Sequence, residues 1–330
     1  MFVPIFQAVE SGIIYAIMAL GVYLSFRVLD FPDLTVDGSF VTGAGVAAIA
    51  IVNDVPTVIA TLLAVVAGFI AGSITGILNT KGKINPLLSG ILMMTALYSI
   101  NLRIMGQPNL ALLNEDTIFT QIRSFWSALG IDDVLNGMLT SMGLENTPGT
   151  WGILFVMIIV TGLIKLLTDF YLKTEVGLAL RATGDNEKMI RSFSANTDTL
   201  KIIGLGLSNA LVALSGALYA QYGGFADVGM GIGMIVIGLA SVIIGEALIG
   251  TKSIMRVTLA VIGGAIVYRI VVTIALRQAD FLDTGDMKLI TSVLVILALV
   301  IPKLISGQKE AKRKRRKRAE LQNRLKGEAS

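Results

Sequence analysis

The sequence contains no cysteine and no histidine among its 330 residues. These absences exclude disulfide frameworks, Cys/His zinc sites, cysteine nucleophiles, histidine-dependent triads and histidine-ligated haem. Charge is also scarce, because Asp, Glu, Lys and Arg make up only 15% of the chain, against about a quarter in an ordinary globular domain. Ten of the 27 basic residues lie in the segment 309–326. The rest of the chain therefore lacks the positive charge of a nucleic-acid-binding protein.

Apolar residues are abundant instead: they form 54% of the chain, and the mean hydropathy is +0.76. A bilayer core of about 30 Å needs about 20 apolar residues per helix. Candidate spans lie at 8–28, 37–52, 57–78, 87–105, 151–172, 201–221, 231–249, 257–277 and 288–305. The composition predicts an all-α, polytopic membrane protein with about nine transmembrane helices (eight to ten). These helices form a membrane domain over 1–305, followed by a basic tail over 306–330.

The basic residues predict the orientation of these spans. With the C-terminus in the cytoplasm, 22 of the 27 Lys and Arg residues fall on the cytoplasmic side, as positively charged loops do. The N-terminus is then outside, and so is the acidic loop 106–150. An amphipathic pattern over 118–129 of this loop predicts a helix that lies on the membrane or receives a binding protein. The basic tail is expected to attract anionic lipid.

A polar segment, 29–39, interrupts the apolar sequence between the first two spans. It contains Asp30, Asp33 and Asp37 together with a proline and a glycine, which cannot continue a lipid-facing helix. Two interpretations remain open. The segment is either a cytoplasmic turn with Asp37 near a helix N-terminus, or a broken helix that lines a polar cavity at membrane depth.

A second interruption, 221–233, precedes the short seventh span and has a similar pattern of aromatic, acidic and glycine residues. The two breaks follow spans of opposite direction, as in the inverted repeats of transporters. A true repeat and a coincidence are both open. Aromatic residues flank both breaks and can either stack on a substrate or anchor the membrane interface. We predict that the substrate pathway includes Asp30, Phe31, Asp33, Asp37, Tyr219 and Phe225.

The largest cytoplasmic loop predicts two short helices, one over 174–181 that stops at Gly184 and one that begins with Asp185 as its N-cap. Apolar residues recur among charged ones in both. A solvated linker is the alternative, but this spacing favours a helix pair that buries an apolar face on a partner protein.

The segment 173–186, KTEVGLALRATGDN, resembles the "RTRLGRALRAVGENP" segment of permeases from the branched-chain amino acid and ribose family of ABC importers. The similarity runs in order over about 10–305 and includes the small-residue segments 11–21 and 208–220. In that family the loop, here 173–200, is a cytoplasmic coupling loop that sits in a cleft of the ATPase subunit. The resemblance assigns ATPase coupling to Glu175, Gly177, Leu178, Ala179, Arg181, Gly184, Asp185 and Asn186.

The segment 29–39 departs from the "LNFAHG"-like motif of the branched-chain permeases and resembles that of a subgroup linked to aromatic amino acids, tryptophan especially. The resemblance implies the permease subunit of an amino acid importer in a bacterial cytoplasmic membrane. Its implied partners are ABC ATPase subunits, an extracytoplasmic substrate-binding lipoprotein and a second permease copy in a homodimer. ATP and Mg²⁺ would bind the ATPase, and this chain would carry no catalytic residue, metal or cofactor.

Two other classes of protein remain. An ion-coupled secondary transporter also suits broken helices and membrane carboxylates, but it has no use for the helix pair after 173. An intramembrane enzyme would need paired aspartates on facing spans, whereas these aspartates share one break. The segment 245–253 only approaches a phosphate-binding loop, since Thr251 separates the second glycine from the lysine.

Overall fold

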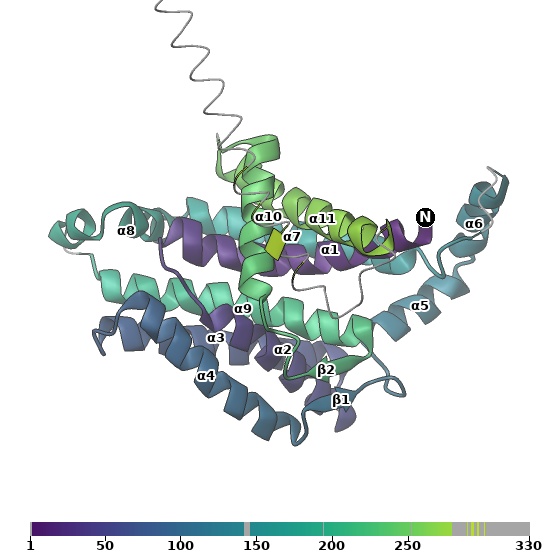
Figure 1. Ribbon diagram of the computed structural model, residues 1–330, viewed down its shortest axis with the longest axis horizontal. Coiled ribbons are helices and arrows are strands. Elements are labelled where there is room, and N and C mark those ends of the chain that lie inside the picture. The colour runs from purple at the N-terminus through teal and green to yellow at the C-terminus, as the bar shows by residue number, and fades with distance from the viewer. Residues whose placement is uncertain are drawn as a thin grey trace, which may run out of the picture.

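The computed structural model describes residues 2–141, 146–193, 195–251 and 253–278, together with Leu289, Ser292, Val293, Ile296 and Val300. Seven helices in this part of the chain are long and apolar enough to cross a membrane, and α10 is a shorter apolar helix. The long helices are α1 (Phe2–Tyr23), continued by the π-helix η1 (Leu24–Val28), α2 (Thr35–Val52), α3 (Thr57–Thr80), α4 (Pro86–Met105), α7 (Gly152–Lys173), α9 (Thr197–Gly223) and α11 (Ile254–Gln278). Helix α10 covers Met234–Ile249. The predicted all-α, polytopic membrane fold is confirmed (Figure 1).

Eight of the nine predicted spans coincide with these helices, and the ninth, 288–305, lies mostly outside the described residues, as does the tail 306–330. Some boundaries differ from the prediction. Helix α9 begins at Thr197 because the Asn196 side chain accepts a hydrogen bond from the Thr199 backbone N–H at 3.1 Å. Helix α10 begins after Gly233, whose φ of 88° turns the chain into the helix.

Small elements cover the end of the bundle opposite α8 (Glu175–Ser192). The amphipathic helix predicted there is confirmed as α5 (Ile118–Ala128), and α6 (Ile131–Ser141) follows it. Strands β1 (Asn109–Ala111) and β2 (Phe225–Asp227) pair antiparallel, with Leu110 opposite Ala226. Three-residue strands are too short to be predicted from a sequence pattern. The sequence therefore did not indicate this contact between the loop 106–150 and the second break.

The helix packing has the pattern expected of an inverted repeat, in which the helices that follow the two breaks have equivalent neighbours. Helix α2 follows the first break and packs against α3 and α9, whereas α10 follows the second break and packs against α11 and α1. Helices α1 and α9 run side by side in opposite directions, with α11 beside α1 and α3 beside α9 (Figure 1). The packing therefore favours a true repeat over coincidence.

Glycines bring α2 and α9 into backbone contact. A Cβ on Gly43 would lie 1.9 Å from the carbonyl oxygen of Ala213, and a Cβ on Gly216 would lie 2.0 Å from that of Phe40. Real Cβ atoms do not approach carbonyl oxygens this closely, so the two helices must separate if either glycine gains a side chain.

We expect Gly43→Ala to destabilise the protein by about 1–3 kcal/mol because it overpacks this contact. The control is Gly162→Ala in α7, where a Cβ would have no neighbour within 4 Å. The thermal midpoint of the detergent-solubilised protein should fall for the first variant only. Equal midpoints would contradict the backbone contact.

Candidate functional site

Helix α8 forms the helix pair predicted for the segment after 173, as one kinked element. The Thr174 side chain caps its start by accepting a hydrogen bond from the Gly177 N–H at 3.2 Å. Asn186 has non-helical backbone angles at the kink, and its side chain accepts a hydrogen bond from the Met189 N–H at 3.1 Å. The second half is therefore capped by Asn186, and the prediction of Asp185 was wrong by one residue. Asparagine and aspartate are both good caps, so the sequence could not distinguish them.

One face of α8 packs on the membrane helices. Leu180 is fully buried in a cluster with Leu29 from the first break and Leu205 from α9. Gly177 and Thr183 are also buried on this face. The burial anchors α8 to both the first break and the start of α9.

Apolar side chains of α8 and of its C-cap residue Phe193 are exposed. They are Val176 (46%), Leu178 (52%), Met189 (47%) and Phe193 (73%). Leu178 lies on the side of the helix opposite the buried Leu180, and Val176, two residues before it, lies on a different side. Of the other predicted coupling residues, Glu175, Asp185 and Asn186 are exposed, and Ala179, Arg181 and Gly184 are half-buried. The described residues leave these apolar side chains, which the sequence predicts to be buried on a partner protein, uncovered.

Gly184 connects α8 to the first break. A Cβ there would lie 2.1 Å from the carbonyl oxygen of Val28, the last residue of η1, and 3.0 Å from the carbonyl carbon of Leu29. The backbone of α8 is therefore in direct contact with the residues that precede Asp30.

The three aspartates of the first break have different environments. Asp30 is exposed and has a φ of 51°, in the left-handed region that Asp tolerates better than most residues. Asp33 is fully buried, and its carboxylate accepts hydrogen bonds from the Thr35 N–H at 2.9 Å and the Asn209 side chain at 2.7 Å. Asp33 thus joins the first break to α9.

Asp37 joins the two breaks to each other. Its two carboxylate oxygens accept hydrogen bonds from the Gly233 N–H at 3.0 Å and the Ile235 N–H at 2.8 Å, at the start of α10. Asp37 lies in the first turn of α2, as the interpretation of an acid near a helix N-terminus predicts. The hydrogen bonds to the start of α10, in the other half of the protein, were not predicted. The carboxylate also complements the positive end of the α10 dipole.

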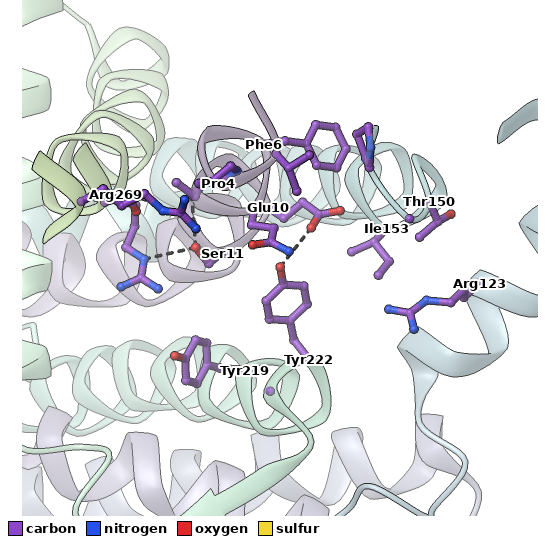
Figure 2. Close-up of a pocket in the computed structure, with 18 residues that line it drawn as sticks. Pro4, Phe6, Glu10, Ser11, Arg123, Thr150, Ile153, Tyr219, Tyr222 and Arg269 are labelled. Carbon is purple, nitrogen blue, oxygen red and sulfur yellow. Dashed lines mark hydrogen bonds between the residues drawn. The ribbon is translucent and has the colours of Figure 1, made fainter. Parts of the chain in front are cut away.

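The structure does not gather the six predicted pathway residues into one cavity. A larger cavity of about 700 Å³ lies among α1, α7, α9 and α11 and includes Tyr219 (Figure 2). A smaller one of about 280 Å³ lies between α2, α4 and the second break and includes Asp37. Phe31 is buried beside Leu180, Phe225 is 41% exposed in β2, and Asp30 and Asp33 line neither cavity.

Sequence reasoning missed the four charged residues of the larger cavity, which are Glu10, Arg123, Arg269 and Arg277. Glu10 lies in α1, and Arg269 and Arg277 lie in α11, both apolar helices in which charged residues are rare and mark functional positions. That signal was present in the sequence, but the pathway residues were predicted from the two breaks alone.

Residues 5–301 match the model of the family described as "Branched-chain amino acid transport system / permease component". The chain belongs to this family. A "Tyrosine transport system permease protein" of Clostridioides difficile is 41% identical over 295 residues, which cover 89% of this chain and 90% of that relative. An uncharacterised protein of Rickettsia prowazekii, RP368, is 32% identical over 298 residues, covering 88% and 95%. The "Ribose import permease protein RbsC" of Escherichia coli K12 is 27% identical over 217 residues, covering 65% and 60%. No solved structure matches.

The family confirms the resemblance drawn from the 173–186 motif. The chain is a permease component of an ABC-type transport system and a multi-pass membrane protein. Its named relatives are transport proteins, which agrees with a transport role and not an enzymatic one. The secondary-transporter interpretation is set aside.

Proposed function

We propose that this chain is the permease subunit of an ATP-driven importer of aromatic amino acids, with an ATPase subunit docked on α8. The observation that carries the proposal is the exposed apolar face of α8 around Leu178, on a helix whose opposite face is buried against the first break. An exposed apolar helix face outside the membrane is typical of a helix that docks in a groove of a partner.

Two observations support an aromatic amino acid as the substrate. The 29–39 segment resembles the subgroup linked to tryptophan, and the C. difficile relative is named for tyrosine transport. Both substrates are aromatic amino acids. Within the chain, aromatic rings cluster beneath the larger cavity, where Tyr15 and Tyr219 have ring centroids 4.9 Å apart.

The contacts suggest how ATP hydrolysis on the partner would be transmitted. Closure of two ATPase subunits would displace α8, and Gly184 would press on the end of η1. The displacement would reach α9 through the Asp33–Asn209 hydrogen bond and α10 through Asp37. Substrate access would then alternate at the two breaks. We keep as the proposed pathway the break residues Asp30, Phe31, Asp33, Asp37 and Phe225, together with Tyr219, which precedes the second break.

The rest of the proposed assembly follows from the same orientation. The end with α8 faces the cytoplasm of a bacterium, and the end with α5 and α6 faces outward and receives a substrate-binding protein. Two ATPase subunits require two docking helices, and a homodimer of this chain is the simplest closed arrangement that supplies them. ATP and Mg²⁺ bind the ATPase.

The test is to purify the tagged chain from its native membrane in mild detergent and identify the co-purifying proteins by mass spectrometry. We expect an ABC-type ATPase in stoichiometric amount. Recovery of the permease without any ATPase would overturn the proposal.

A further inference from the structure

The larger cavity contains a buried acid that lacks a full set of partners. Glu10 of α1 is only 5% exposed, and its Oε2 accepts a hydrogen bond from the Tyr222 hydroxyl at 3.0 Å. Its Oε1 is buried and has no hydrogen-bond partner within the described part of the chain. Buried carboxylate oxygens almost always accept a hydrogen bond, so Oε1 can accept one from a ligand.

A guanidinium group lies in the same cavity. Arg269 of α11 donates a hydrogen bond from Nε to the Ser11 Oγ at 3.2 Å, and its guanidinium carbon lies 4.7 Å from the centre of the Tyr15 ring. These contacts hold the side chain in place. Its two terminal nitrogens donate no hydrogen bond to any described residue, so they can form a paired contact with a carboxylate.

The acid and the base are close in the fold without neutralising each other. Ser11, which holds Arg269, follows Glu10 directly, and Figure 2 shows both charged side chains on the α1 side of the cavity. No ion pair in the described residues joins Glu10 to Arg269. Arg123 and Arg277 also line the cavity. The cavity therefore presents one carboxylate, Glu10, and several guanidinium groups, of which Arg269 is held in place by Ser11 and Tyr15, to a ligand that carries both charges.

Aromatic rings complete the lining. Tyr219 and Tyr222 face the cavity from α9, and Phe6 faces it from α1 (Figure 2). Its volume of about 700 Å³ lies within the range of roughly 300–1,000 Å³ typical of small-molecule sites. Aromatic side chains stack favourably on other rings.

We propose that this cavity binds the zwitterion of an aromatic amino acid, with Glu10 accepting from its ammonium group and Arg269 donating to its carboxylate. The inference rests on the proposed function, because the ligand is the transported class of molecule. It adds a specific binding site at the end of the bundle that bears α5 and α6, lined in part by Tyr222 and Gly223 of the second break but by none of the aspartates of either break.

The test measures equilibrium binding of radiolabelled L-tyrosine to the full-length permease in lipid nanodiscs, together with any ATPase that co-purifies. Binding without the substrate-binding protein isolates the permease's own site. Tyramine, which lacks the carboxylate, and 3-(4-hydroxyphenyl)propionate, which lacks the ammonium group, serve as competitors. We expect L-tyrosine to bind saturably and each analogue to compete about tenfold to a hundredfold more weakly, because each loses a charged hydrogen bond.

Two variants test which side chain binds the ammonium group of the ligand and which binds its carboxylate. Glu10→Gln should weaken L-tyrosine binding by a similar factor and abolish discrimination against 3-(4-hydroxyphenyl)propionate. Arg269→Gln should do the same for tyramine, and Arg269→Lys should restore part of the affinity by keeping the charge. The matched controls, Glu115→Gln and Arg103→Gln, change residues that line neither cavity and should bind as wild type.

The two proposals fail separately. Wild-type affinity in both cavity variants, equal competition by the analogues, or no L-tyrosine binding to a wild-type permease that carries its ATPase would overturn the cavity assignment and leave the importer standing. Absence of the ATPase would overturn the proposed function whatever the cavity binds.

Discussion

Replacement of Val176 and Leu178 with aspartate abolishes ATPase association with the permease. Both side chains are about half exposed and lie on different sides of α8, so that docking of the helix in a groove would bury both. Burial of each is worth about 1.5–3 kcal/mol, and two carboxylates in an apolar groove add a desolvation penalty. The expected loss of affinity is therefore on the order of a hundredfold or more. It is measured as the amount of ATPase that co-purifies with the tagged permease.

The control places the same substitutions at the other end of the bundle. Val134 and Met138 are exposed apolar residues of α6, at 65% and 61%, and their double aspartate variant should retain the ATPase. The α8 variant should keep its thermal midpoint, because Leu180 and the buried face are unchanged. Normal ATPase recovery with the α8 variant would show that the exposed face does not dock the ATPase.

Exchange of Asp33 for asparagine is expected to reduce uptake at least tenfold. Both partners of the carboxylate, the Thr35 N–H and the Asn209 amide, are donors. An asparagine at this position has one acceptor oxygen, so either orientation sets an NH₂ group against another donor. A buried unsatisfied donor costs about 1–3 kcal/mol. The thermal midpoint and the uptake rate should both fall.

The double variant Asp33→Asn with Asn209→Asp tests the pair itself. It restores one donor and one acceptor between the two side chains, although the hydrogen bond from Asn209 to the Leu205 carbonyl is lost. Partial recovery of uptake is expected. The control, Asp54→Asn, changes an exposed turn residue with a φ of 59°, which asparagine accepts. Additive losses in the double variant would show that the two side chains do not act through each other.

The sequence predicted what depends on local pattern. The seven long apolar helices and the shorter α10 followed from the length of apolar runs, and the exposed apolar side chains of α8 followed from residues such as Val176 and Leu178 among charges. The Asn186 cap was missed by one residue because neighbouring Asp and Asn have the same capping preference.

Contacts between segments that are distant in the chain could not be predicted from the sequence. Nothing in the local pattern of Asp37 indicates that it accepts hydrogen bonds from Gly233 and Ile235, almost 200 residues away. The same limit applies to Tyr219 and Phe225, which lie close in sequence but end in a cavity and a strand respectively. Side-chain type restricts the chemistry of a residue, whereas the packing of helices selects its partner.

Transport in proteoliposomes is the most direct measurement of the central claim. The permease, its co-purified ATPase and the substrate-binding protein are reconstituted, and radiolabelled L-tyrosine uptake is followed with ATP and Mg²⁺ on the side that bears α8. The account predicts uptake that requires ATP hydrolysis and is lost in the Val176 and Leu178 aspartate variant. Uptake driven by a proton or sodium gradient without ATP would contradict it.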